Sequence, residues 1–334
     1  MQSTEAAALD AEIFDGIANT RQRLTHAIHQ AVIGQDEVIE LVLITLLAQG
    51  HALLIGVPGL AKTLLVRTVS DALGLGFRRI QFTPDLMPTD ILGTEVLEED
   101  RQSGSRSFRF VPGPVFTHLL LADEINRTPP KTQAALLEAM QESAVTVAGE
   151  TRPLDTPFCV LATQNPIEQE GTYPLPEAQL DRFMLSIDVG YPGEQEEVDI
   201  VRATTHGESP SIEPVLDRET LMAQQALVRR LPTSDEVVRY AVRLARSTRP
   251  DNGGCAVAQR WVQWGAGPRA SQYLTLGARV RAALHGHEVA SIEDVRAVAR
   301  AVLGHRVLLN FEAEAEGRSV HSVIDEILEE VPVR

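Results

Sequence analysis

One loop of eight residues carries the groups that a polyphosphate needs. Its sequence is Gly56-Val57-Pro58-Gly59-Leu60-Ala61-Lys62-Thr63. Glycines let backbone N–H groups turn toward phosphate oxygens, a lysine reaches the outer phosphates, and a hydroxyl binds magnesium. The residues predicted to hold the phosphates are Gly56, Pro58, Gly59, Leu60, Ala61, Lys62, Thr63 and Leu64, with Thr63 also a Mg2+ ligand. The alternative is an ordinary strand, turn and helix with a chance lysine.

One position of this loop departs from the strict phosphate-loop pattern. Ala61 stands where a third glycine is usual, and its methyl group is tolerable if the residue already has helical φ and ψ angles. Only two of the 30 basic residues are lysines, Lys62 and Lys131. A compact ammonium group therefore stands where a point charge is wanted, in a chain that otherwise uses arginine.

Acidic and polar side chains follow two apolar runs further along the chain. The run 119–122 ends in Asp123-Glu124, and the run 158–162 is followed by Thr163-Gln164-Asn165-Pro166. Ligands of parallel sheets gather beyond the carboxyl ends of the strands. Asp123 is therefore predicted to bind Mg2+ and Glu124 to polarise the attacking water, unless the two acids only cap the next helix. Asn165 could orient that water or could be an ordinary turn residue.

The elements around these residues alternate between strand and helix patterns, which predicts a parallel sheet covered on both faces. Asp36 is a candidate N-cap for a helix over 37–48. Two hairpins are expected, one with strands 94–97 and 107–111 around the turn 102–105, the other beginning at 144–147. Helices only are expected after residue 193, at 216–230, 234–246, 270–284, 291–303 and 320–329. The predicted fold is an α/β nucleotide-binding core with an N-terminal helix over 1–192, then a linker and a small all-helical lid over 193–334.

Composition narrows the function further. The chain has 334 residues, 44% of them hydrophobic, and a net charge of -16. No block of basic residues stands out, so nucleic-acid binding is not expected. Two cysteines, the lack of a signal-peptide pattern and an interrupted apolar region at 39–57 make a reducing cytoplasm and no membrane span the expectation.

An ordered set of short motifs resembles the MoxR family of AAA+ ATPases, over about residues 30 to 310. The motifs are Val32-Ile33-Gly34, Ala61-Lys62-Thr63, Ala122-Asp123-Glu124-Ile125-Asn126-Arg127, Thr163-Gln164-Asn165-Pro166, Leu180-Asp181-Arg182-Phe183 and Gly265-Ala266-Gly267-Pro268-Arg269-Ala270. The resemblance is to the branch with a hairpin inserted in its second helix, which includes magnesium-chelatase ATPase subunits and minichromosome-maintenance helicases.

This resemblance implies ATP and Mg2+ as cofactors and gives roles that spacing alone did not. Val32, Ile33 and Gly34 correspond to the adenine pocket. Asn165 corresponds to a sensor of the terminal phosphate. Arg182, which alone indicates no more than a surface ion pair, corresponds to an arginine finger that reaches a neighbouring subunit's nucleotide. Arg269 corresponds to a second sensor arginine on the lid.

A finger acting on a neighbour requires a ring, usually a hexamer in this family. Arg127 could be a further contact between subunits. Trp261 and Trp264, just before the Arg269 motif, are interpreted as lid core rather than as a binding platform. The acidic C-terminal helix is most simply a solvated face.

The function indicated is an ATP-hydrolysing homo-oligomeric ring. It would remodel or mature a protein client, with metal or cofactor insertion as one such task and a separate von Willebrand factor A domain protein as the partner. A nucleic-acid motor related to the helicases is one alternative. Its expected hairpin, however, carries only Arg101, Arg106 and Arg109, against Glu95, Glu98, Glu99 and Asp100. A scaffold timed by slow hydrolysis is the other alternative.

Overall fold

A five-stranded parallel sheet forms the centre of the larger lobe. The computed structural model describes residues 2–99, 106–168, 171–205, 211–251 and 253–333. The predicted turn 102–105, Asp100 and Arg101 lie outside these ranges. The strands are β1 (Ala52–Ile55), β2 (Phe77–Gln81), β5 (Leu119–Asp123), β8 (Cys159–Gln164) and β9 (Leu185–Asp188), in the order β2-β5-β8-β1-β9. The predicted parallel sheet is confirmed, and its strands end at one common edge.

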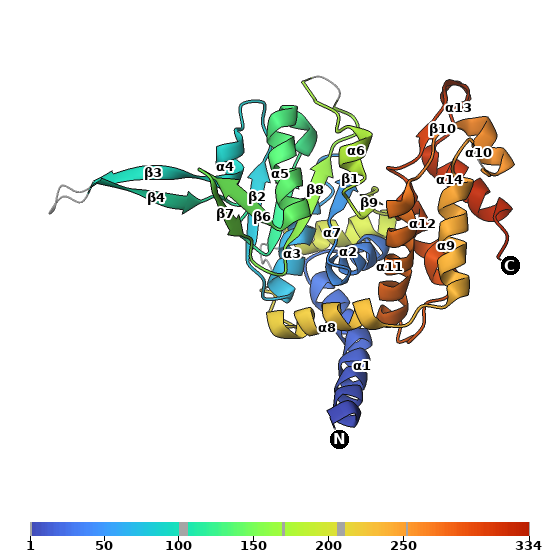
Figure 1. The fold of residues 1–334 in the computed structure, drawn as a ribbon, viewed down its shortest axis with the longest axis horizontal. Coiled ribbons are helices and arrows are strands. Elements are labelled where there is room, and N and C mark those ends of the chain that lie inside the picture. Colours follow the sequence, from blue (N-terminus) through green and yellow to red (C-terminus); the bar gives the residue numbers. More distant parts are fainter. Residues whose placement is uncertain (1, 100–105, 169–170, 206–210, 252, 334) are drawn as a thin grey trace.

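Alternate residues of the central strands pack on opposite faces of the sheet. Leu119 and Leu121 belong to one apolar cluster, whereas Leu120 and Ala122 belong to another. The first cluster includes residues of α1 (Gln2–His29), α2 (Asp36–Leu47) and α3 (Lys62–Ala72), and the second includes residues of α5 (Pro130–Glu142). Because strand side chains alternate, this pattern covers both faces with helices (Figure 1).

The second helix of the core begins differently from the prediction. Its first residue is Asp36, and the N-cap position belongs to Gln35, which has a left-handed conformation with φ 60°. Asp36 as N-cap was therefore wrong. The carboxylate of Asp36 instead accepts a 2.9 Å hydrogen bond from the His29 ring, and the Gln35 amide turns toward the phosphate loop.

Both predicted hairpins are present. Strands β3 (Gly93–Glu99) and β4 (Arg106–Pro112) pair antiparallel and project from the side of the core (Figure 1), and β6 (Ala144–Val147) pairs with β7 (Glu150–Pro153). The described arginines of the longer hairpin, Arg106 and Arg109, are each paired with a glutamate of the opposite strand, Glu99 and Glu98 respectively. Their charges are therefore largely neutralised within the hairpin.

Further short helices lie between the strands of the core or follow the last of them. They are α4 (Pro88–Leu92), the 3-10 turn η1 (Ile125–Arg127), α6 (Glu177–Leu180) and α7 (Glu194–Thr205). The described helices that follow are α8 (Arg218–Arg230), α9 (Asp235–Ser247), α10 (Ala256–Trp261), α11 (Pro268–Leu284), α12 (Ile292–Leu303), α13 (Phe311–Ala315) and α14 (Val320–Glu330). None of the helices within the described ranges is long and apolar enough to cross a membrane.

The lid is helical except for one small sheet, so the expectation of an all-helical lid needs one correction. Strands β10 (Val262–Trp264) and β11 (Leu308–Leu309) pair antiparallel. Trp261 is buried, as expected for lid core, between the guanidinium groups of Arg260 and Arg318. Trp264 is 68% exposed, so its prediction as lid core was wrong. Regular alternation would place Trp264 on the same face as the buried Val262, but the pairing register shifts between these two residues, so the short strand does not keep that alternation.

Candidate nucleotide-binding site

A cavity of about 370 Å3 lies where the phosphate loop meets the ends of β5 and β8. Its lining residues are Pro58, Gly59, Leu60, Ala61, Lys62, Thr63, Leu64, Asp123, Glu124, Thr163 and Asn165. The fold thus brings together three motifs that lie far apart in the sequence. Strands β1, β5 and β8 are neighbours and end at the same edge of the sheet, which accounts for this convergence.

Lys62 points into the loop that precedes it. Its ammonium group donates to the carbonyl oxygen of Val57 at 3.1 Å and also to that of Gly56. Burial lowers the pKa of Lys62, whereas the nearby Asp123 and Glu124 carboxylates raise it. A phosphate oxygen offers this cation a stronger acceptor than a carbonyl does, so the geometry fits an anionic ligand.

Two loop residues have left-handed backbone conformations. Gly59 has φ +87°, and a Cβ atom there would meet nothing within 4 Å, so its glycine serves the backbone rather than packing. Ala61 has φ 55° and ψ 18°, immediately before α3. The condition under which its methyl group was expected to be tolerable, helical angles, is therefore not met, because the loop turns at this residue before the helix begins. A left-handed alanine stores about 1 kcal/mol of strain.

The two acidic residues at the end of β5 line the same cavity but differ in their contacts. Asp123 is buried, and its carboxylate accepts a 2.6 Å hydrogen bond from the Thr163 hydroxyl. Glu124 has a left-handed backbone with φ 57°, and its N–H donates to the same hydroxyl at 2.8 Å. Thr163 therefore fixes the orientation of both acids from the neighbouring strand.

Both carboxylates already have partners within the chain. Arg79 of β2 forms a 2.6 Å ion pair with Asp123. Gln81, two residues later, donates a 2.7 Å hydrogen bond to the Glu124 carboxylate, and Arg127 pairs with the same carboxylate at 3.2 Å. Arg127 also pairs with Glu168, and its role as a contact between subunits stays a prediction.

The donor set fits a magnesium ion held jointly with phosphates. No group of three or more His, Cys, Asp or Glu side chains in the described ranges forms a metal cage. Mg2+ is usually held by one or two protein oxygens together with waters and substrate phosphates. Thr63 and Asp123 line the same cavity as Lys62 and could provide that limited set of oxygens.

Asn165 is buried at the end of the same cavity. Its side-chain oxygen accepts a 3.2 Å hydrogen bond from the Ile167 N–H, as in an ordinary turn. The amide NH2 makes no such bond to the described residues, so it stays available as a donor toward the cavity. The turn and sensor interpretations are therefore compatible, and the sensor role stays a prediction.

The segment predicted to bind adenine borders the phosphate loop without lining its cavity. Val32 is buried, and the Gln35 amide donates to the Leu60 carbonyl at 3.3 Å. The Glu196 carboxylate packs so closely on Gly34 that a Cβ atom there would lie 2.1 Å from it. The φ of +69° favours glycine at this position, whereas the Glu196 side chain could move to relieve the contact. The base-binding role of Val32, Ile33 and Gly34 stays a prediction.

Arg182 and Arg269 lie together, outside this cavity. Arg269, in the first turn of α11, forms a 2.9 Å ion pair with Asp181, the residue before Arg182. The Arg182 guanidinium makes no hydrogen bond or ion pair with any residue in the described ranges. Neither arginine lines the cavity of the phosphate loop. The structure therefore groups the two arginines with each other rather than with Lys62.

No role was predicted for four residues that lie near these sites, Arg79, Gln81, Thr163 and Arg306. Thr163 could have been found, because it ends a strand beside the Asn165 motif. Arg79 and Gln81 could be found only once β2 was known to neighbour β5.

Comparison with known proteins agrees with this geometry. Residues 51–185 match the ATPase family associated with various cellular activities (AAA), and residues 256–327 match the AAA lid domain. Chaperone MoxR1 of Mycobacterium tuberculosis is 43% identical over 314 residues, which is 94% of this chain and 82% of that protein. Protein MoxR of Methylorubrum extorquens is 33% identical over 332 residues, 93% of this chain and 94% of that protein.

The chain belongs to the MoxR family of AAA ATPases. A crystal structure from Cytophaga hutchinsonii, described as that of an ATPase, superimposes on this MoxR-family chain with a TM-score of 0.90. It has 39% identity, and the match covers 99% of both chains. The resemblance inferred from the motifs is thus confirmed, as are the α/β core and the following lid. AAA ATPase domains bind nucleotide, and the chain is of the chaperone kind within that family.

Proposed function

We propose that this MoxR-family protein hydrolyses ATP with Mg2+ at the subunit interfaces of a ring, and that it uses this cycle to remodel or mature a protein complex. The observation that carries the proposal is the separation of the catalytic groups into two sets. Lys62, Thr63, Asp123, Glu124 and Asn165 surround one cavity, whereas Arg182 lies outside it without a partner in the described residues. With Arg182 in the catalytic set, we propose that a second subunit completes each site.

Within one subunit, each side chain has a distinct task. Lys62 and the loop N–H groups bind the outer phosphates. Thr63 and Asp123 would hold Mg2+, which would offset the negative charge of the phosphates. Glu124 orients the attacking water and accepts its proton, after release from Gln81. Asn165 positions the same water or the terminal phosphate.

The remaining charge is offset from the neighbouring subunit. Negative charge spreads over the equatorial oxygens of the transferred phosphoryl group, and an arginine supplied by a neighbour commonly stabilises it. Arg182 suits this role because no carboxylate in the described residues competes for it. The pairing of Arg269 with Asp181 supports a joint action of both arginines at the neighbour's nucleotide. Such head-to-tail contacts close into a ring, and we propose a hexamer.

The client is proposed to be a protein complex that needs metal or cofactor insertion, presented by a separate von Willebrand factor A domain protein. The name of the relative Chaperone MoxR1 supports the remodelling role. Capture with a Glu124→Gln form locked with ATP would identify the partner. Recovery of a von Willebrand factor A domain protein that is lost with Lys62→Ala would support the proposal.

The direct test of the activity is Mg2+-dependent phosphate release. Lys62→Ala and Glu124→Gln should each abolish it, with Glu124→Gln still binding ATP. Lys131→Ala, which changes the only other lysine, serves as the matched control. Full turnover in either of the first two variants would contradict the proposal.

A further inference from the structure

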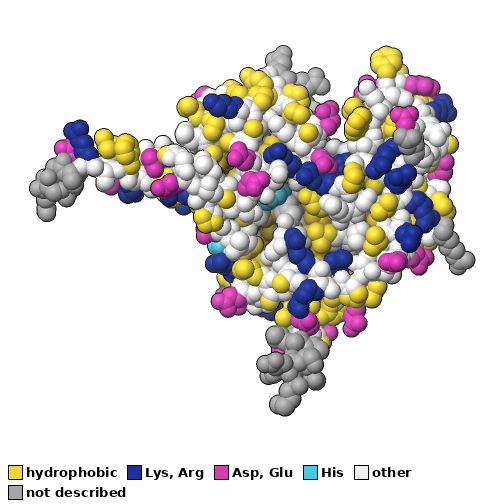
Figure 2. Space-filling view, viewed as in Figure 1, with side chains coloured by type: hydrophobic (Ala, Val, Ile, Leu, Met, Phe, Trp, Pro, Cys, Tyr) yellow, Lys and Arg dark blue, Asp and Glu magenta, His cyan; other side chains and the backbone are white. Residues whose placement is uncertain are grey.

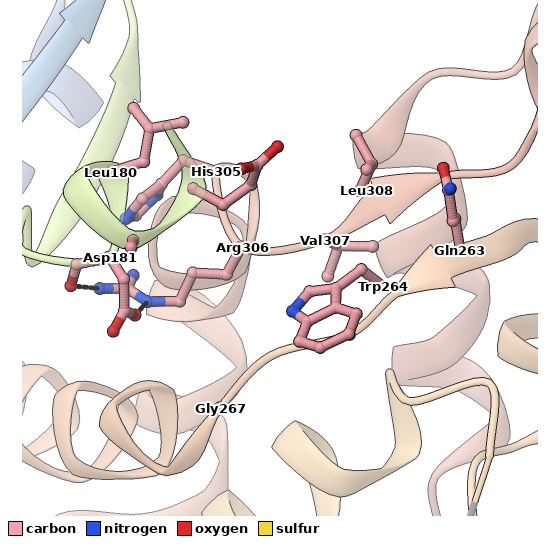
Figure 3. Close-up of a pocket in the computed structure, with 12 residues that line it drawn as sticks. Leu180, Asp181, Gln263, Trp264, Gly267, His305, Arg306, Val307 and Leu308 are labelled. Carbon is pink, nitrogen blue, oxygen red and sulfur yellow. Dashed lines mark hydrogen bonds and ion pairs between the residues drawn. The ribbon is translucent and has the colours of Figure 1, made fainter. Parts of the chain in front are cut away.

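The groove between the core and the lid contains a buried arginine that holds the segment around Arg182. The groove has a volume of about 710 Å3 and is lined by α6 on one side and by residues 263–267 and 305–308 of the lid on the other. Figure 2 shows it as the notch between the two lobes at the top of the view. In Figure 3, the Arg306 side chain extends from the lid to Asp181 of the core.

Arg306 uses every one of its five N–H groups. Nε donates to the Asp181 carboxylate at 2.8 Å, and Nη2 donates to the carbonyl oxygens of Asp181 at 3.0 Å and Phe183 at 2.6 Å. Nη1 donates to Met184 O at 3.2 Å and to Val302 O. The side chain is only 2% exposed. A guanidinium group has five donors in a rigid fork, so its position is fully determined by these acceptors.

These contacts surround Arg182 in the sequence. The carbonyl oxygens of Asp181, Phe183 and Met184 all accept from Arg306, and the His305 ring is 3.0 Å from the Phe183 carbonyl. The backbone on both sides of Arg182 is therefore attached to the lid. The Arg182 side chain itself takes no part in this attachment and makes no hydrogen bond or ion pair with the residues that the structure describes.

Arg306 also connects this segment to α12. It follows that helix directly, its N–H donates to Leu303 O at 2.9 Å, and its guanidinium binds Val302 O. A movement of α12 would therefore move the backbone at 181–184 with it. The Asp181 carboxylate is shared between Arg306 and Arg269, so two lid arginines hold the residue before Arg182.

We propose that Arg306 is a positioning residue for Arg182, so that the orientation of the lid in one subunit determines where that subunit's Arg182 lies at the nucleotide site of the next subunit. This inference rests on the proposed trans role of Arg182. A lysine at 306 would keep the charge but could not bind the carbonyl oxygens on both sides of Arg182 at once. A displacement of a catalytic group by about 1 Å can lower the rate on the order of 100-fold, so we expect Arg306→Lys to lower the turnover rate.

The test uses the full chain with Arg306→Lys. We expect kcat for ATP to fall about 10- to 100-fold. Binding of a fluorescent ATP analogue should stay within about twofold, because the subunit's own cavity is unchanged. The matched control is Arg296→Lys, since Arg296 binds Tyr240 and Leu328 O within the lid and does not contact 181–184. Arg296→Lys should retain near-normal kcat. Asp181→Asn, which removes the charge and one of the two acceptor oxygens that Arg306 and Arg269 share, should show a fall of the same kind.

A mixing experiment separates positioning from general stability. Glu124→Gln subunits cannot hydrolyse ATP but carry an intact Arg182, so in one-to-one mixed rings about half of the Arg306→Lys sites would face a normal arginine. Those sites should recover activity, as should the sites of Arg182→Ala subunits mixed in the same way. Loss of activity that is not recovered, or equal loss in Arg296→Lys, would overturn the inference.

The outcomes also distinguish this inference from the proposed function. If Arg182→Ala subunits are not restored by Glu124→Gln subunits in assembled rings, the trans role of Arg182 fails. If they are restored and Arg306→Lys subunits are not, the trans role stands and the positioning role of Arg306 fails. Should Arg306→Lys prevent assembly, the same comparison is made with Asp181→Asn, and absence of recovery there refutes the inference.

Discussion

Replacing Arg79 by methionine should make this protein bind Mg2+ more tightly. Arg79 donates from Nε at 3.1 Å and from Nη2 at 2.6 Å to the same oxygen of Asp123. If Asp123 is a metal ligand, this ion pair competes with Mg2+ for the carboxylate. Methionine keeps the apolar stem of the side chain and removes the competing charge.

The size of the effect follows from the exposure of the pair. Hydrogen bonds to charged groups contribute about 1.5–3 kcal/mol when buried, and exposed ion pairs contribute about 0–1 kcal/mol. The Asp123 side chain is 13% exposed and that of Arg79 is 47% exposed, so the pair lies between these limits, at about 1–2 kcal/mol. That range corresponds to roughly 5- to 30-fold tighter Mg2+ binding.

The assay is the Mg2+ concentration that gives half-maximal ATP hydrolysis, compared between the parent protein and Arg79→Met. Arg78→Met is the control, because Arg78 neighbours Arg79 on β2 and has no ion pair with the described residues. An unchanged or weaker Mg2+ dependence in Arg79→Met would refute the competition between Arg79 and the metal.

Three further predictions concern stability. Ala61→Gly should leave the free energy of unfolding unchanged or raise it by up to about 1 kcal/mol, because glycine relieves the left-handed strain. The control, Ala297→Gly on the exposed side of α12, should lower it by about 1 kcal/mol. An equal loss in both variants would show that Ala61 is not strained. Trp261→Ala should lower that free energy by about 3–5 kcal/mol in chemical denaturation and Trp264→Ala by less than about 1 kcal/mol, so similar losses would contradict their different burial. The Asp188 carboxylate, 2.6 Å from His321, raises the pKa of that imidazole through a hydrogen bond, so this ion pair stabilises the contact between core and lid below about pH 6.5 and is lost as the pH rises through the raised pKa. His321→Gln should therefore lower the free energy of unfolding by no more than about 1 kcal/mol, and only at acidic pH. Thermal melts from pH 5 to 8 test this, and a loss at every pH would contradict it.

The nucleotide cavity could be predicted because its parts are local in sequence. A strand, a glycine-bearing loop and Lys62 are consecutive, and Asp123 and Asn165 each follow an apolar run. Parallel strands then bring such ends to one edge of the sheet, whatever the loops between them. For this reason the grouping of Lys62, Asp123 and Asn165 followed from pattern alone.

The contacts that restrain these groups could not be predicted in the same way. The pairing of Arg79 with Asp123 depends on β2 lying beside β5, which is a matter of strand order. Arg306 contacts Asp181 across 125 residues of sequence, and nothing in its neighbours distinguishes it from other arginines. The exposure of Trp264 was not predicted because it accompanies a shift of pairing register within a three-residue strand, which no residue type in that strand indicates.

The positions of residues with left-handed backbone conformations could not be predicted from the sequence either. Gln35, Ala61 and Glu124 all have positive φ angles and lie around the proposed nucleotide site. None is a glycine, the residue that most readily adopts this conformation, so residue type does not predict it. Gln49, Ser143 and Ala148 share the conformation and do not line the cavity, so a positive φ angle alone does not identify the site.

The central claim is that each ATP site is completed by Arg182 of a neighbouring subunit. Its most direct test mixes two inactive variants, Arg182→Ala and Lys62→Ala, and measures ATP hydrolysis over a range of mixing ratios. Lys62→Ala subunits would lend their Arg182 to the intact cavities of Arg182→Ala subunits, so activity should rise from both pure forms to a maximum at intermediate ratios. Mixed rings that assemble and yet show no activity at any ratio would contradict the claim.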